Sequence, residues 1–187
     1  MPSPEALDFL LTRRSRPPKL FSPPGPDHAE LLRLLTAAAR VPDHGKLEPW
    51  RFVVLEGAGK ARFAAAIRER ATAAGQDPDK GALAFEQAPL AVAVVSSPKP
   101  SDKIPAIEQT LSSGNVALSL LNAALAAGWG ASWMTGWAAY DRPLVEGVLG
   151  LAPHESVTGF VYLGSCTTPP PDRPRPDVPA LVTWIGD

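Results

Sequence analysis

The sequence predicts an α+β or α/β fold in which helices alternate with strands around one long helix. Apolar residues recur at helical spacing in several segments, and short β-rich apolar runs lie between those segments. Residues 104–127 form the longest helical pattern, which is apolar on most of its circumference. No Gly-x-Gly-x-x-Gly follows a predicted strand and no Gly-Lys-Ser/Thr occurs, which argues against a Rossmann unit and a P-loop.

In the first half of the chain, the apolar pattern predicts three helices and one strand. Leu7, Leu10 and Leu11 share one helical face. Asp27 is a suitable N-cap for a second helix, which Pro42 terminates. The expected elements are helices at 5–14, 27–40 and 61–74 and a buried strand at 51–56, with an irregular proline-rich segment at 20–26.

The second half of the chain predicts three strands and two helices. Gly128 and Gly130 end the long helix, which is either central in the fold or shared with a partner subunit because most of its faces are apolar. The expected strands are 91–97, 131–136 and 158–165, and the expected helices are 104–127 and 142–149.

Residues 166–187 form a C-terminal arm of different composition. Six prolines between positions 169 and 179 exclude a regular helix or a central strand there. Residues 180–185 regain β character, and such an apolar run is unsuited to a free tail. We therefore expect an arm that docks through an apolar strand, with a second subunit as the candidate surface; the alternative is a loose extension.

Composition and charge describe a globular protein that forms one domain over residues 1–187. Apolar residues make up 45% of the chain, charged residues 20%, and the net charge is −1. Neither nucleic acid nor a membrane is therefore an expected partner. Cys166 is the only cysteine and the N-terminus lacks a signal-peptide pattern, which indicates a reducing, cytoplasmic location.

No side-chain pattern for metal binding or nucleophilic catalysis stands out. His28, His44 and His154 are far apart in the sequence, and none has a histidine four residues away. Gly-x-Ser-x-Gly is absent, and Cys166 has no evident histidine partner. We therefore expect neither a structural metal site nor a serine or cysteine nucleophile.

Arg13-Arg14-Ser15-Arg16, at the end of the first predicted helix, forms a candidate phosphate cradle. Planar guanidinium groups and a hydroxyl offer bidentate donors to an anion. Arg173 and Arg175, held extended by neighbouring prolines, could complete the same anion site. The alternative is structural, since cations also complement the dipole at a helix C-terminus and arginines in a polar arm are commonly solvated.

Two further segments suit a flat heteroaromatic ring. Pro42 and Pro49 hold the connection around Arg40 and His44 extended and rigid. Glycines flank the strand at residues 130–136, so backbone N–H groups there could approach a ring closely. The alternatives are a surface loop and a plain core strand.

Taken together and in this order, four segments resemble the FMN-dependent nitroreductase family over nearly the whole chain. They are Arg-Arg-Ser-Arg from Arg13, Pro-x-x-x-x-x-x-Pro-Trp from Pro42, Gly-Trp-Gly-Ala-Ser-Trp from Gly128, and Arg-x-Arg-Pro from Arg173. The Val-Pro-Asp-His version of the second segment is closest to the small, single-domain NAD(P)H nitroreductase subfamily.

The resemblance implies a nitroreductase-like α+β fold, with a central, mostly antiparallel sheet flanked by helices. It also implies a homodimer that exchanges its C-terminal arms and binds FMN at each dimer interface. The implied cofactor-binding residues are Arg13, Arg14, Ser15, Arg173 and Arg175 at the phosphate and ribityl end, Arg40 and His44 from the other subunit, and the backbone of Trp133, Met134 and Thr135 at the ring.

The activity implied by the resemblance is that of an FMN-dependent NAD(P)H oxidoreductase. NADH or NADPH would deliver hydride to the flavin N5, and a nitroaromatic or quinone-like acceptor would then take it in a ping-pong cycle. The alternatives are a flavin-binding or storage module without significant turnover and a flavin-dependent dehydrogenase or reductase of a specialised metabolite.

This chain departs from the family pattern at Lys46 and Glu48, where many members have Asn and Gln. Lys46 could still lie near the pyrimidine end of the ring and stabilise the reduced, anionic flavin. Glu48 removes an amide donor from the expected ring contacts.

Overall fold

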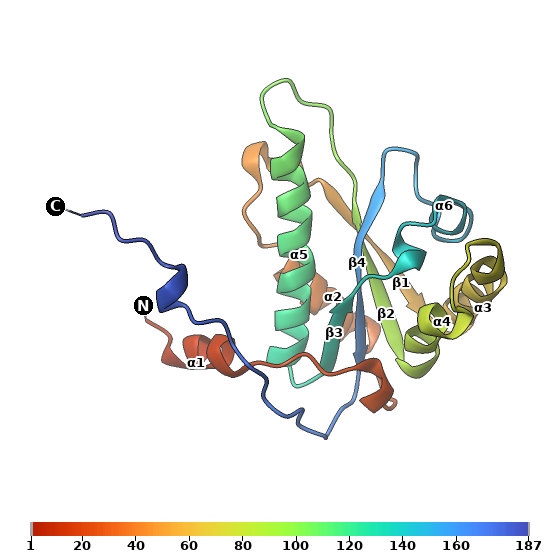
Figure 1. Ribbon diagram of the computed structural model, residues 1–187, viewed down its shortest axis with the longest axis horizontal. Helices are drawn as coiled ribbons and strands as arrows, with labels where there is room; N and C mark the ends of the chain where they lie inside the picture. The colour runs from red at the N-terminus through yellow and green to blue at the C-terminus, as the bar shows by residue number, and fades with distance from the viewer. Residues whose placement is uncertain (1, 187) are drawn as a thin grey trace.

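A four-stranded antiparallel sheet separates two layers of helices in the computed structural model, which describes residues 2–186 (Figure 1). The strand order is β1-β2-β4-β3, so β1 and β3 are the edges of the sheet. The strands are β1 Trp50–Glu56, β2 Leu90–Ser96, β3 Gly130–Met134 and β4 Ser156–Gly164. The helices are α1 Pro4–Thr12, α2 His28–Ala38, α3 Gly57–Ala73, α4 Pro78–Gln87, α5 Ala106–Ala126 and α6 Arg142–Leu149. The predicted α+β fold with an antiparallel sheet is confirmed.

Alternate residues of the two central strands face two separate cores. Ala93 of β2 and its partner Phe160 of β4 face the core beneath α3, α4 and α6. Their neighbours Val92 and Val161 face the core beneath α2 and α5. Because helices cover both faces, every residue of β2 is buried, which explains the continuous apolar run from Leu90 to Val95.

The capping prediction for α2 is confirmed. Asp27 Oδ1 accepts a hydrogen bond from the Glu30 N–H at 2.8 Å, and Glu30 Oε2 accepts one from the Asp27 N–H at 3.1 Å. This reciprocal pair is a capping box, which satisfies two backbone donors at the helix start. The helix ends at Ala38, two residues before the predicted end.

Helix α4 has no counterpart among the predicted elements. Its buried residues are Ala82 and Phe85, and its ten residues include Gly81, which disfavours a helix interior. The local indication of its start is the Asp77–Pro78 pair, because Asp77 Oδ1 accepts a hydrogen bond from the Asp79 N–H at 2.9 Å. Among residues 2–186 there is no helix with both the length and the apolar composition needed to cross a membrane.

Helix α1 ends before the arginine cluster, which corrects the helix predicted at residues 5–14. Arg13 leaves the helical conformation with φ −56° and ψ 142°, so Arg14 does not continue the apolar stripe of the helix. That stripe also lies outside the core, since Leu7 and Leu11 are 59% and 69% exposed. In the single chain, α1 therefore presents an apolar face to solvent.

The C-terminal arm forms no strand in the single chain, which corrects the strand expected at residues 180–185. A short 3-10 helix at Pro179–Leu181 is followed by extended backbone that leads away from the sheet (Figure 1). A strand needs a neighbouring backbone for its hydrogen bonds, and no other segment within residues 2–186 supplies one. Trp184 and Ile185 are almost fully exposed.

Candidate functional site

Segments from opposite ends of the chain meet in one pocket beside β3, which we call the arginine pocket. It has a volume of about 340 Å³. Its lining residues are Arg13, Arg14, Ser15, Leu121, Trp133, Arg173 and Arg175. All of these except Leu121 are site residues expected from the sequence.

The chain converges here because the segment after α1 follows the edge strand β3. The Arg16 N–H donates to the Ala131 carbonyl at 2.9 Å, and Arg16 Nη1 donates to the Cys166 carbonyl at 2.7 Å. Arg14 Nη1 donates to the carbonyl of Pro171 in the arm. These contacts hold the early and late arginines on the same side of the sheet edge.

Positive charge is concentrated in the arginine pocket. Burial lowers the pKa of the Arg13 guanidinium, and repulsion from the neighbouring guanidiniums of Arg175, Arg14 and Arg173 lowers it further. Arg13 Nη2 donates to Ser15 Oγ at 3.2 Å, but its buried Nε has no hydrogen-bond partner within residues 2–186. A buried donor without an acceptor among several guanidiniums fits a phosphate or another multivalent anion.

A carboxylate lies at the rim of the arginine pocket without lining it. Asp172 Oδ1 is 3.2 Å from Arg14 Nη1 and 3.0 Å from Arg175 Nη2. The backbone N–H of Arg173 and the Arg175 guanidinium hold the pKa of Asp172 below its usual value. Asp172 therefore neutralises part of the charge of the pocket while leaving its interior open.

Trp133 forms one wall of the pocket, and Gly159 on β4 makes room for it. A Cβ added to Gly159 would lie 1.9 Å from Trp133 Nε1. Met134 faces the opposite side of the sheet, as strand alternation requires, and lines a small cavity there with Thr135. Of the three expected ring contacts, only Trp133 directs its side chain into the arginine pocket.

The loop that carries His44 has a constrained backbone. Gly45, Lys46 and Glu48 have φ values of 74°, 54° and 49°. The Asp43 carboxylate accepts hydrogen bonds from the N–H groups of Leu47 and Glu48, at 3.3 Å and 2.8 Å. Left-handed backbone at residues other than glycine costs free energy and is enriched at functional sites.

Contacts with α5 fix this loop far from the arginine pocket of the same chain. His44 Nδ1 lies 2.6 Å from Glu108 Oε2, and Ser112 Oγ donates to the Pro42 carbonyl at 3.0 Å. Glu108 is in the first turn of α5, whereas Leu121 of the arginine pocket is 13 residues further on. At 1.5 Å per residue the two positions are about 20 Å apart along the helix. His44 therefore lies far from the arginines of the same chain, and Arg40 does not line the arginine pocket.

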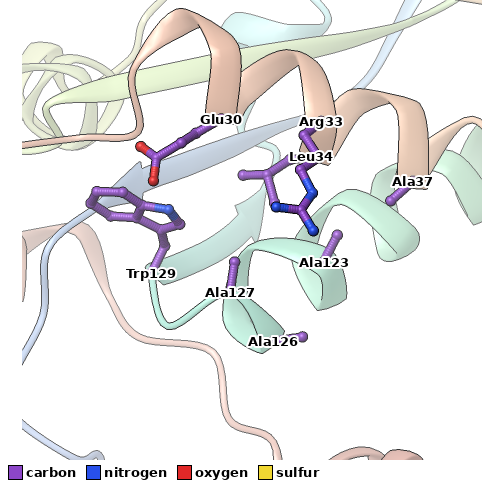
Figure 2. Close-up of a pocket in the computed structure, with 8 residues that line it drawn as sticks. All are labelled: Glu30, Arg33, Leu34, Ala37, Ala123, Ala126, Ala127 and Trp129. Carbon is purple, nitrogen blue, oxygen red and sulfur yellow. The ribbon is translucent and has the colours of Figure 1, made fainter.

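A larger cavity, of about 540 Å³, lies between α2 and α5. Figure 2 shows Arg33 reaching from α2 toward α5, with Trp129 and Glu30 at the other end of the cavity. The remaining lining residues are Leu34, Ala37, Ala123, Ala126 and Ala127. None of the site residues expected from the sequence lines this cavity, so charge rather than volume distinguishes the candidate site.

The motifs and the fold together agree with one known family. The family model described as Nitroreductase family matches residues 10–165. This chain belongs to the nitroreductase family. It is 37% identical over 164 residues to the Escherichia coli K12 protein named "Putative NAD(P)H nitroreductase YdjA", with 86% of this chain and 88% of that protein covered.

Solved structures share the nitroreductase fold over the full chain. A nitroreductase-like family protein from Bacillus cereus has a TM-score of 0.83 at 21% identity and covers 99% of this chain and 98% of its own. A Desulfovibrio desulfuricans protein described as "a putative nitroreductase in complex with fmn" has a TM-score of 0.76 at 18% identity and full coverage of both chains.

The structure adds three residues to the site that the sequence motifs did not identify. They are Asp172 at the pocket rim, Glu108 beside His44, and Gly159 beside Trp133. The sequence offered a local signal for Asp172, because this residue immediately precedes the arm arginines. The sequence offered no such signal for Glu108, because its partner His44 is 64 residues away. Within residues 2–186, no group of three or more His, Cys, Asp or Glu side chains is placed to hold a metal ion.

Proposed function

We propose that this protein is an FMN-dependent NAD(P)H oxidoreductase that holds the FMN phosphate in the arginine pocket. The observation that carries the proposal is the gathering of four guanidinium groups and a serine hydroxyl around the unpartnered Nε of Arg13. A phosphate dianion supplies the acceptors and the negative charge that this arrangement lacks. The name of the E. coli relative and the FMN complex of the D. desulfuricans protein support the same assignment.

The side chains of the site bind and orient rather than react. The arginines would hold the phosphate, Trp133 would form a wall, and the backbone of Met134 and Thr135 would meet the ring. When bound, FMN would supply the redox chemistry, which is the transfer of reducing equivalents from NADH or NADPH to a nitroaromatic or quinone-like acceptor. Because the cofactor would carry the redox chemistry, the site needs no side chain that acts as an acid, a base or a nucleophile.

We propose that a homodimer completes the site. One face of α5 exposes Ile107, Leu111 and Leu118, which are 62%, 59% and 41% exposed. A two-fold axis through this stripe would pack α5 antiparallel to its copy. His44, beside the first turn of α5, would then reach the arginine pocket of the partner, and Arg40 in the same segment would contribute to that site. This arrangement accounts for a site whose parts are about 20 Å apart in one chain.

The arm would dock on the partner in the same dimer. Its exposed apolar residues are Val178, Leu181, Val182, Trp184 and Ile185. Strand β1 has a free edge, and beside it lies a mainly apolar groove of about 320 Å³, lined by His28, Leu31, Leu32, Leu35, Val54 and Glu56. Strand addition at this edge would supply the backbone partner that residues 180–185 lack in the single chain.

The visible spectrum of the purified protein tests the proposal. We expect a yellow protein, or one that becomes yellow after incubation with FMN and desalting. Anaerobic addition of NADH or NADPH should then bleach the flavin band rapidly. A protein that stays colourless with excess FMN would contradict the cofactor assignment, and bound flavin that neither nucleotide reduces would indicate a storage module instead.

A further inference from the structure

Asp172 joins two arginines that line the pocket and come from opposite ends of the chain. Its Oδ1 atom contacts Arg14 Nη1 at 3.2 Å and Arg175 Nη2 at 3.0 Å. Arg14 Nη1 also donates to the Pro171 carbonyl, so the guanidinium is held by two consecutive residues of the arm. The side chain of Asp172 is 76% exposed and does not line the pocket.

When no anion is bound, a contact with a carboxylate would offset two unfavourable properties of the arginine pocket. Four guanidiniums at close range repel one another, and the pKa of Arg13 is lowered in part for this reason. Arginine side chains are long and lose considerable rotamer freedom when they are fixed. A carboxylate that binds two of these arginines reduces their mutual repulsion. It also orders their side chains in advance, so that a ligand loses less binding free energy in ordering them.

We propose that Asp172 is a positioning residue, which holds the guanidiniums of Arg14 and Arg175 side by side so that a phosphate meets a preformed pair of donors. The inference rests on the proposed function, since it concerns the phosphate end of FMN. Asp172 also repels a phosphate, but water screens that repulsion because the carboxylate is exposed. The hydrogen bonds that fix the two arginines act at contact distance and are less affected by screening.

The test compares Asp172→Asn with the matched variant Asp177→Asn. Asp177 lies in the same exposed arm, and its side chain makes no hydrogen bond within residues 2–186. Binding of FMN and of riboflavin, which lacks the phosphate, is measured by flavin fluorescence for each protein. We expect Asp172→Asn to weaken FMN binding about three- to tenfold and to leave riboflavin binding unchanged. Asp177→Asn should change neither, and both variants should unfold at the wild-type temperature.

The other outcomes overturn the inference in distinguishable ways. Tighter FMN binding by Asp172→Asn would mean that the carboxylate competes with the phosphate. Equal losses for FMN and riboflavin would mean that Asp172 only anchors the arm, and unchanged FMN binding would mean that it has no role in recognition. If the wild-type protein bound FMN no better than riboflavin, the proposed phosphate site itself would be wrong.

Discussion

Arg51 forms a two-point ion pair with Glu155, in which Nε lies 2.7 Å from Oε1 and Nη2 lies 2.6 Å from Oε2. The Glu155 side chain is buried, and its Oε2 also accepts a hydrogen bond from the Ala152 N–H at 2.9 Å. The pair connects β1 to the turn before β4, across the central strand β2. Hydrogen bonds from Arg51 lower the pKa of Glu155 to about 2, with a smaller contribution from the Ala152 N–H.

Glu155→Gln should destabilise the protein in a pH-dependent way. The pKa of Glu155 in the folded state lies below its unfolded value, so its contribution is present above about pH 4.5 and is lost as the pH falls toward 2. We expect a loss of about 2–3 kcal/mol in unfolding free energy near pH 6, and a smaller difference near pH 3. Denaturant unfolding at both pH values measures the difference in unfolding free energy between the variant and the wild type. Glu146→Gln, which removes a charge from an exposed ion pair, is the control. A difference independent of pH would contradict the assignment.

Arg14→Ala should weaken FMN binding strongly. Loss of one charge-assisted phosphate contact costs about 1.5–3 kcal/mol, on the order of a ten- to hundredfold rise in Kd. Arg62→Ala removes the same charge from an exposed position on α3 and should leave the Kd unchanged. Fluorescence titration with FMN measures the Kd of both variants. Equal effects of both variants would indicate only a general charge effect.

Leu111→Asp should dissociate the proposed dimer and release the flavin. Leu111 is 59% exposed on the apolar stripe of α5, and a buried aspartate without a partner there would oppose association. Leu83→Asp, at a 40% exposed position on α4, is the matched control and should leave the dimer intact. Sedimentation velocity with absorbance at a flavin wavelength reports both properties. A monomer that retains FMN at micromolar protein would contradict a site shared between subunits.

Gly45→Ala should disturb the His44 loop. Gly45 has φ 74°, and a Cβ there would lie 2.3 Å from Ile104 Cδ1, so alanine is both strained and crowded. We expect a loss of stability of about 1–2 kcal/mol together with weaker FMN binding. Gly147→Ala, within α6 and with open space around it, should be neutral or stabilising by up to about 1 kcal/mol. Thermal unfolding and FMN titration of both variants test the prediction.

The features that could be predicted from the chain alone depend on neighbours in sequence. The four strands follow from short apolar runs, and the start of α2 follows from Asp27 and Glu30, because pleating and capping involve residues a few positions apart. The arginine motifs could likewise be recognised one by one. Helix α4 could not be predicted in this way, because it is only ten residues long and contains Gly81, which lowers its helix propensity.

The convergence of those motifs depends on contacts between residues far apart in sequence. Arg14 meets Pro171 across 157 residues only because the chain after α1 follows β3 and the arm leaves from β4. The same packing places His44 at the opposite end of α5, although its motif resembles those that share a site with the arginines. Sequence spacing carries no information on such distances, because strand pairing and helix packing set them. Local chemistry therefore identifies the groups that suit a flavin phosphate, and the packed chain determines which of them one subunit brings together.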